Sequence, residues 1–173
     1  MISIISCYYF RILFVFLGIG IISGCSYSFT GASVPEHIKT IAIPIVKDRS
    51  GSGQPELSDL FTNGLIQDFI DDNTLQIAEK VDADAVLECT IISLSDAPSL
   101  ISSGESVTTR RITVTAQVTY KDLVMRKTIF SKNFSNYADY QSSGDIVTLR
   151  KEAIESSVDK IVEDILLAVV SNW

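Results

Sequence analysis

The clearest pattern in the chain is a strict alternation of apolar and polar residues between Ile112 and Tyr120. This pattern is typical of a strand in an antiparallel sheet that has one buried and one polar face. The strand is predicted over residues 107–121 and should be the longest of the fold. Its apolar set is Ile112, Val114, Ala116, Val118 and Tyr120, and its polar set is Thr113, Thr115, Gln117 and Thr119.

Three other segments have the composition of strands. Residues 39–46 place isoleucines at every second position, and Pro44 puts this strand at an edge or makes it irregular, because proline donates no ladder hydrogen bond. Residues 85–94 form a second apolar run. The turn KDLVMRK leads into a strand over about 128–137.

Two segments have the spacing of amphipathic helices, about 56–72 and about 145–170. The element order is therefore strand, helix, three strands, helix. This order predicts an α+β fold, a two-layer sandwich in which two amphipathic helices cover one face of a four-stranded, mainly antiparallel sheet.

The N-terminal segment has the features of a secretory signal. Arg11 precedes an apolar run that ends at small residues. The sequence Ile22-Ser23-Gly24-Cys25 resembles the bacterial lipobox, and this resemblance implies cleavage before Cys25 and attachment of diacylglycerol and an N-acyl chain such as palmitate to that residue. Two or more acyl chains anchor a protein firmly to a bilayer. We expect a signal peptide over 1–24, a lipidated tether over 25–37 and one domain over 38–173.

Charge is unevenly distributed along a chain whose formal net charge is -7. Acids dominate residues 54–90 and bases dominate 105–135, which predicts an electrically polarised molecule. Neighbouring Arg110 and Arg111 are the strongest candidates for contact with an anionic ligand, since an arginine fork grips phosphate or carboxylate. The further candidate cations are Lys121, Arg126 and Lys127. The acidic charge and the secretory signal both disfavour nucleic acid as a partner.

Residues for catalysis or metal binding are scarce. His37 is the only histidine, and Cys89 would be the only free thiol left after cleavage and lipidation. Cys89 lies in an apolar run and is expected to be a buried small side chain. We expect no metal, no cofactor and no enzymatic activity.

The mature sequence resembles the LptE family of lipopolysaccharide-assembly lipoproteins. The resemblance covers the tether and first strand CSYSFTGASVPEHIKTIAIPIVKDRSG, then FTNGLIQDFI, NTLQI, ADAVLECTI and TTRRITVTAQVTYKDL, and the closing helix. It departs from better-known members after the cysteine, at Tyr27-Ser28-Phe29. Lipopolysaccharide contacts therefore cannot be transferred by motif.

The resemblance implies a role in the outer membrane. Family members have two helices and four strands and plug the LptD β-barrel, with which they deliver lipopolysaccharide. The polar set Thr113, Thr115, Gln117 and Thr119 would suit a polar barrel lumen. Ser26 follows the anchor where an Asp is associated with retention in the inner membrane, so sorting to the outer membrane is expected. An alternative is an envelope adaptor of the curli-export or penicillin-binding-protein-activator type, because those lipoproteins share a similar first strand, loop and helix.

Overall fold

The computed structural model describes residues 34–99 and 109–171. Three features predicted from the sequence lie outside these residues: the signal peptide, Cys25 with the tether up to residue 33, and the start of the long strand at 107–108. The last residues of the predicted tether are described, and they contact the domain. Val34 packs against the core, and His37 Nε2 lies 2.7 Å from Asp122 Oδ2.

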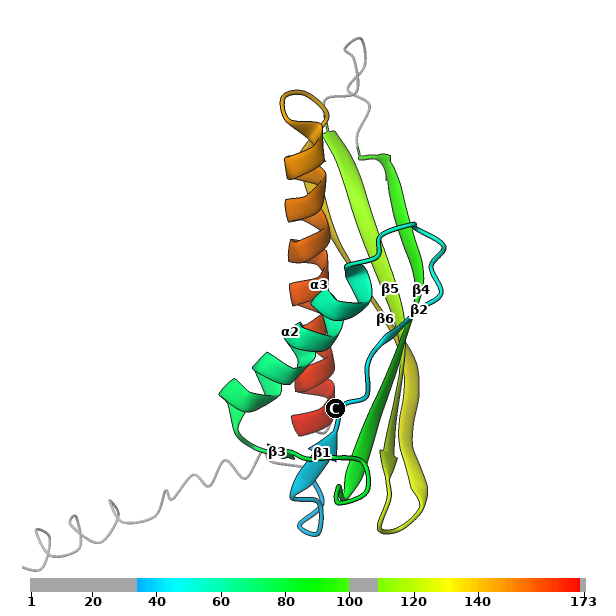
Figure 1. Cartoon of the computed structure of the whole chain (residues 1–173), viewed down its shortest axis with the longest axis vertical. Helices are drawn as coiled ribbons and strands as arrows, with labels where there is room; N and C mark the ends of the chain where they lie inside the picture. The colour runs from blue at the N-terminus through cyan, green and yellow to red at the C-terminus, as the bar shows by residue number, and fades with distance from the viewer. Residues whose placement is uncertain (1–33, 100–108, 172–173) are drawn as a thin grey trace, which may run out of the picture. The chain divides into compact units, whose positions relative to one another are not determined.

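Among the described residues, six strands form one sheet (Figure 1). They are β1 (Thr40–Ala42), β2 (Lys47–Asp48), β3 (Gln76–Ile77), β4 (Ala85–Pro98), β5 (Thr109–Asp122) and β6 (Lys127–Gln141). Their order is β3-β1-β4-β5-β6, and β2 pairs with β4. The long strands β4, β5 and β6 pair antiparallel with one another, whereas β1 runs parallel to both β3 and β4, and β2 runs parallel to β4. The prediction of a four-stranded, mainly antiparallel sheet is therefore wrong in strand number and in the orientation of the N-terminal strands.

Of the predicted first strand, 39–46, only β1 is regular; pairing stops before Pro44 and resumes beyond the prediction at β2, which confirms the expected irregularity. The backbone N–H and carbonyl of Val46, two residues after Pro44, form hydrogen bonds with helical side chains instead of with a neighbouring strand. Its N–H donates to Thr62 Oγ1 at 3.0 Å, and its carbonyl accepts a hydrogen bond from the Ser58 hydroxyl. Proline lacks the N–H that a continuous ladder would need at this point. The strand consequently breaks where helical side chains can satisfy the backbone.

The short strand β3 was not predicted. It spans two residues and pairs with β1 through Thr40–Gln76 and Ile41–Ile77. Two exposed residues are too few to show an alternation of apolar and polar side chains. The strand is recognised only from its pairing with β1. The predicted strands 85–94 and 128–137 are confirmed, although both extend further. Over the residues that the structure describes, β6 has 15 residues and β5 has 14, so the described part of β5 is not the longest strand.

Both helices begin and end close to the predicted residues. Helix α2 (Leu57–Asp72) ends at Asn73, whose left-handed φ of 56° stops the helix. Helix α3 (Ile146–Val170) begins after Asp145, and the carboxylate of Asp145 accepts the Thr148 N–H. A side-chain acceptor at this position satisfies one of the free amides of the first turn.

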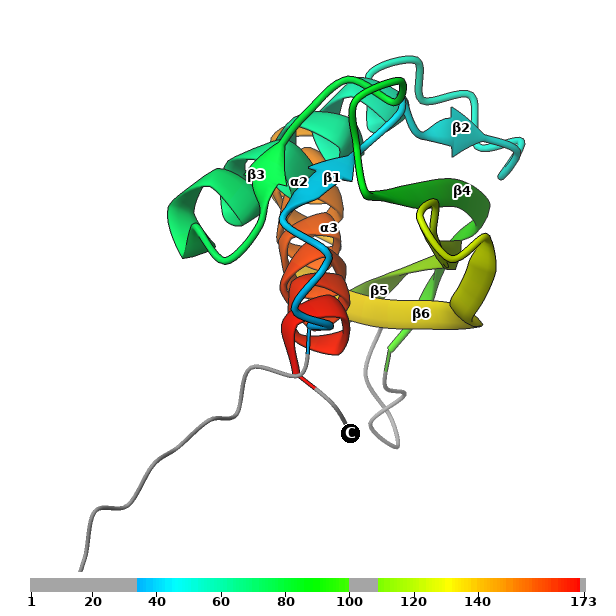
Figure 2. The same ribbon diagram turned by 90° about the horizontal axis from the view of Figure 1, so that it is seen from below.

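The core lies between the helices and the sheet. Figure 2 shows α3 beside β5 and β6, and α2 packs against α3 and the short strands. The predicted apolar side chains of β5, from Ile112 to Tyr120, are at most 2% exposed. Helix α2 contributes Leu57, Phe61, Leu65 and Phe69 to the same core. The alternation along β5 therefore correctly predicts which face of this strand is buried.

Candidate functional site

The face of β5 that points away from the core is polar along the described strand. Thr113, Thr115 and Thr119 are half-buried and Gln117 is exposed. On the neighbouring strand, Ser135 lies opposite Thr115 and Ser131 opposite Thr119. The hydroxyl oxygens of these two pairs are 2.9 Å and 3.0 Å apart, within hydrogen-bonding distance. This polar face, defined here as Thr113, Thr115, Gln117, Thr119, Ser131, Asn133 and Ser135, is a surface of small side chains that partly satisfy one another.

Arg110 and Arg111 do not form one shared anion site. Successive residues of a strand point to opposite faces, and each arginine has its own internal carboxylate. Arg110 Nε donates to Asp96 Oδ1 at 2.8 Å. Arg111 donates through Nε and Nη2 to the two oxygens of Asp139, at 2.7 and 2.8 Å. The arginine fork recognises a carboxylate as expected, but the carboxylate belongs to the protein itself.

Asp96 is the centre of a small charged cluster. Besides Arg110, it accepts hydrogen bonds from Tyr140 Oη at 2.8 Å and Arg150 Nε at 3.1 Å. Burial raises the pKa of Asp96, but the hydrogen bonds from Tyr140, Arg110 and Arg150 outweigh burial and hold this pKa below its usual value. The cluster ties β4, β5, β6 and α3 together at one end of the sheet.

The other candidate cations are separated from this cluster. Lys121 Nζ lies 2.5 Å from Glu88 Oε2 on β4. Arg126 is in the turn before β6 and has a φ of 54°, and Lys127 is exposed at the start of β6. Neither Arg126 nor Lys127 forms an ion pair with any residue in the described ranges. The five predicted cations are therefore distributed over both ends of β5 and do not form one patch.

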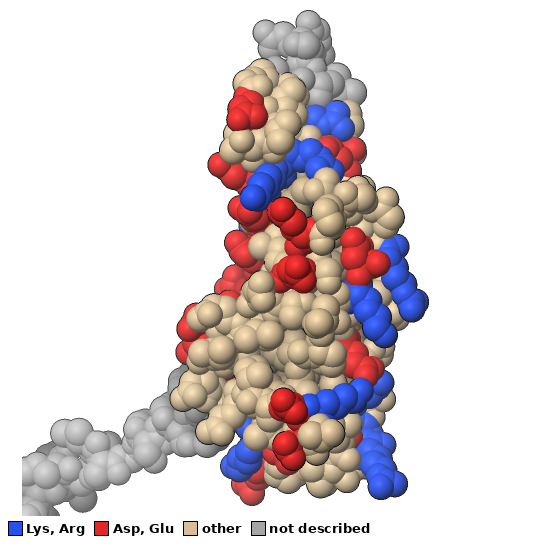
Figure 3. Space-filling model, viewed as in Figure 1, with Lys and Arg blue, Asp and Glu red and all other residues tan. Residues whose placement is uncertain are grey.

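Charge is less polarised in space than along the sequence. Strand β4 contributes Glu88 and Asp96, which pair with Lys121 and Arg110 of the adjacent β5. In the view of Figure 3, basic and acidic side chains lie next to one another. The antiparallel pairing of an acidic strand with a basic strand neutralises much of the predicted separation.

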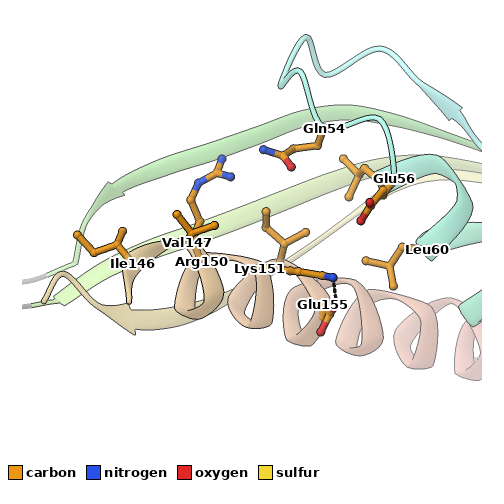
Figure 4. A pocket seen from close by; sticks show the side chains of 10 residues that line it. Gln54, Glu56, Leu60, Ile146, Val147, Arg150, Lys151 and Glu155 are labelled. Carbon is orange, nitrogen blue, oxygen red and sulfur yellow. Dashed lines mark ion pairs between the residues drawn. The ribbon is translucent and has the colours of Figure 1, made fainter. Parts of the chain in front are cut away.

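Sequence reasoning missed a groove between the first turns of α2 and α3. It has a volume of about 360 Å³, and residues almost a hundred positions apart line it. Figure 4 shows Val147 and Arg150 of α3 projecting into the space near Gln54. Val147 is 81% exposed, although it belongs to a helix with a well-buried stripe. The full lining is Gln54, Glu56, Leu57, Leu60, Ile146, Val147, Arg150, Lys151, Ile154 and Glu155.

The groove has an apolar lining and charged groups of both signs. Leucine, isoleucine and valine side chains supply the apolar part, Arg150 and Lys151 supply positive charge, and Glu56 and Glu155 supply negative charge. Lys151 pairs loosely with Glu155 at 3.9 Å. Concave apolar surfaces with a few polar groups are the usual form of ligand sites. The adjacent apolar residues Ile146 and Val147, at the start of the helix, are the sequence signal that could have indicated it.

Residues typical of metal or covalent chemistry are engaged elsewhere. No group of three or more histidine, cysteine or acidic side chains within the described ranges is placed to hold a metal ion. Burial raises the pKa of the Cys89 thiol to about 12, and His37 pairs with Asp122. The helices in the described part of the chain include none with the length and apolarity needed to cross a membrane.

Comparison with known families identifies the chain. The family model for LptE, described as lipopolysaccharide-assembly, matches residues 38–169. The chain belongs to the LptE family. The match begins where the predicted domain begins and covers both helices almost completely.

Solved structures with low sequence identity share the LptE-like fold. Protein XCC0632 from Xanthomonas campestris has 12% identity and a TM-score of 0.60, and the match covers 80% of this chain and 87% of that one. Protein CT253 from Chlamydia trachomatis has 11% identity and a TM-score of 0.58, with 76% and 95% covered. PelC from Paraburkholderia phytofirmans, a dodecamer, has 9% identity and a TM-score of 0.52, with 83% and 96% covered. A comparison with curated protein sequences found no match.

The Asp96 cluster predicts a pH-dependent contribution to stability. Because its folded pKa is lowered, ionised Asp96 stabilises the fold above the unfolded pKa of about 4, and this contribution is lost as the pH falls through the folded pKa. Asp96→Asn should lower the free energy of unfolding at pH 7 by about 1–3 kcal/mol. Urea unfolding at pH 7 and pH 3 measures the difference, which should shrink at pH 3. Asp59→Asn, at an exposed position on α2, is the control. An equal loss at both pH values would contradict the assignment.

Proposed function

We propose that this protein assembles lipopolysaccharide in the outer membrane as the lipid-anchored plug and folding partner of an LptD-type β-barrel. Membership of the LptE family supports a role in lipopolysaccharide assembly. The structural observation that carries the finer proposal is the polar face of β5 and β6. Neither helix covers it, its side chains are uncharged, and two pairs of its hydroxyls, Thr115–Ser135 and Thr119–Ser131, are within hydrogen-bonding distance.

A face of this kind suits the interior of a barrel for a physical reason. The lumen of a transmembrane barrel is lined by polar residues and water. Serine and threonine hydroxyls can exchange hydrogen bonds between their neighbours, water and a lumen wall at small net cost, since each donates and accepts. The absence of charge along the centre of the face also avoids the desolvation that a buried ion would require.

We further propose that lipidated Cys25 anchors the domain and that Ser26 directs it to the outer membrane. The anchor would hold the plug at the periplasmic side of the barrel. The role is proposed to be non-catalytic, and two features support this. Cys89 is 5% exposed and has a raised pKa, and His37 is held by the nearly buried Asp122.

Direct contact with lipopolysaccharide is proposed at the groove between α2 and α3. Acyl chains could lie against its apolar lining while phosphate groups meet Arg150 and Lys151. This location replaces the Arg110–Arg111 pair as the first candidate, because it joins a concave apolar lining to basic side chains, whereas Arg110 and Arg111 point to opposite faces of β5. Arg150 also pairs with Asp96, so the groove and the cluster share one side chain.

The barrel proposal is tested by purifying the tagged full chain from detergent-solubilised membranes and identifying its partners by mass spectrometry. A large barrel in about equal amount is the expected result. Gln117→Arg places a long charged side chain on the polar face and should reduce barrel recovery about tenfold, which corresponds to about 1.4 kcal/mol. Gln67→Arg, an equal change of charge on the exposed side of α2, should not. Recovery of a peptidoglycan synthase or a secretion ring would favour the adaptor alternative instead.

The groove proposal predicts that Val147→Glu weakens lipopolysaccharide binding. A carboxylate among the lining residues would repel phosphate and remove apolar contact, and an effect of about tenfold corresponds to the burial of roughly half a valine side chain. Binding of fluorescent lipopolysaccharide to the detergent-solubilised protein measures it. Val124→Glu, in the exposed turn between β5 and β6, is the matched control. Equal affinities for the two variants would rule out the groove.

The anchor proposal predicts that Cys25→Ala abolishes acylation. Without the thiol no diacylglycerol can be attached, so the variant should carry no acyl chain. Metabolic labelling with radioactive palmitate measures this. Ser26→Ala, at the next position, should still incorporate label. A labelled Cys25→Ala chain would show that the anchor is elsewhere.

A further inference from the structure

A second concave site lies at the side of the polar face where β2 meets β4. It has a volume of about 300 Å³, and two lysines and one acid supply the charged part of its lining. We call this site the lysine pocket. Its polar lining is Lys47, Lys80, Glu88, Thr90, Gln117 and Thr119.

The strand register makes the lysine pocket an extension of the polar face. Lys47 of β2 lies opposite Thr90 of β4, and Glu88 of β4 lies opposite Thr119 of β5. Side chains of directly paired residues lie on the same face of a sheet. The charged groups of the pocket therefore point to the same side as Thr119 and Gln117, away from the helices.

Three lysines share one carboxylate at this site. Glu88 Oε2 accepts from Lys121 Nζ at 2.5 Å, and Glu88 Oε1 accepts from Lys80 Nζ at 3.2 Å. The hydrogen bond from Lys121 and the weaker effect of Lys80 hold the pKa of Glu88 below its usual value although burial opposes them. Lys47 forms no ion pair within residues 34–99 and 109–171. Both oxygens of Glu88 are thus in use, and positive charge is in excess.

This excess becomes important if the polar face is enclosed. In the free domain water solvates the lysines, and the side chain of Lys80 is 59% exposed. A barrel wall that closes over the pocket would remove part of this water. An ammonium group that loses its water without gaining a partner is strongly unfavourable, whereas a carboxylate with good geometry compensates for the loss. A wall that covers the pocket therefore binds well only if it supplies negative charge.

We propose that an acidic side chain on the lumen wall of the barrel enters the lysine pocket and binds Lys47 and Lys80. This inference rests on the proposed plug role and specifies the chemistry of the partner surface. The lysines provide charge-assisted hydrogen bonds to the carboxylate. The amide of Gln117 and the hydroxyl of Thr119 line the same space and can donate to the lone pairs that the lysines leave free.

The lining of the pocket favours a protein carboxylate over a phosphate group of lipopolysaccharide. Lipopolysaccharide brings acyl chains with its phosphates, and acyl chains require an apolar surface. The large apolar side chain at the lysine pocket is Ile45, which is 73% exposed. The groove between α2 and α3 has the apolar lining that the pocket lacks. The two sites therefore have different partners, lipopolysaccharide at the groove and the barrel wall at the lysine pocket.

Zero-length cross-linking of the full chain with its barrel in isolated membranes tests the contact. A water-soluble carbodiimide joins a lysine amine to a carboxylate in contact with it. An amide forms, and the carbodiimide takes up the released water and becomes a urea. Mass spectrometry of the digested complex should find Lys47 or Lys80 joined to an aspartate or glutamate of the barrel. The internal pair Lys121–Glu88 is the positive control for the reaction.

Substitutions of the two lysines separate charge from reactivity. Lys47→Arg combined with Lys80→Arg keeps both charges, so it should abolish the cross-links to the barrel and leave barrel recovery unchanged. Lys47→Glu combined with Lys80→Glu should reduce barrel recovery at least about tenfold, with an unchanged circular dichroism spectrum. Arg126→Glu combined with Lys127→Glu is the matched control, because it reverses two charges in and beside the turn between β5 and β6. Gln117→Arg would fill the pocket and should also weaken barrel binding.

The possible outcomes distinguish this proposal from the plug role itself. A Lys121–Glu88 cross-link without any link from Lys47 or Lys80 to the barrel would overturn the lysine pocket, and so would a link from either lysine to a different protein. Charge reversal that weakens lipopolysaccharide binding but not barrel recovery would assign the pocket to phosphate instead. If the unmodified chain recovers no barrel, the plug role fails, and the proposed partner of the pocket fails with it.

Discussion

The pairing of β5 with long neighbours on both sides is the constraint on which the rest of the structure depends. Strands β4 and β6 hold β5 along nearly its full length, so its alternating side chains are fixed to two faces. Shifting the register by one residue would move Ile112, Val114 and Val118 to the polar side and bury threonines. The core with α3 and the polar face proposed for the barrel therefore arise from the same register.

Electrostatics in this fold is mainly local. Four basic residues of β5 and α3 are paired with Glu88, Asp96 and Asp139 on the neighbouring strands. Partly exposed ion pairs of this kind contribute modestly when isolated. The Asp96 cluster differs because one carboxylate accepts from three side chains on three different elements. Its principal effect is to join the ends of these elements near the groove, where Arg150 belongs to both.

The two edges of the sheet differ in how many of their backbone N–H and carbonyl groups are hydrogen-bonded. At the β1 side, short parallel strands and the Thr62 and Ser58 hydroxyls of α2 satisfy the backbone around Pro44. At the β6 side, Asn136 and Lys160 satisfy one residue and leave the segment 131–135 open.

The sequence by itself determined the elements whose signal is local. The helix starts and ends, the break at Pro44 and the buried face of β5 all follow from residues within one turn or one strand, and the structure confirms them. Family membership also followed from the sequence, because it rests on the order and pattern of these elements. Lipidation of Cys25 stays a prediction, since that residue lies outside the described part of the chain.

Only the tertiary structure decided the features that join distant segments. The strand β3 forms because the chain passes beside β1 after α2. The parallel pairing of β1 with β3 and β4 likewise depends on where α2 ends. Arg110 and Arg111 looked like one anion site in sequence, but the pleat directs them to opposite faces and folding brings Asp96 and Asp139 to them. The groove is formed by the first turns of α2 and α3, which begin at Leu57 and Ile146. Contacts between distant residues are set by how the elements pack, and no local pattern of side chains encodes that packing.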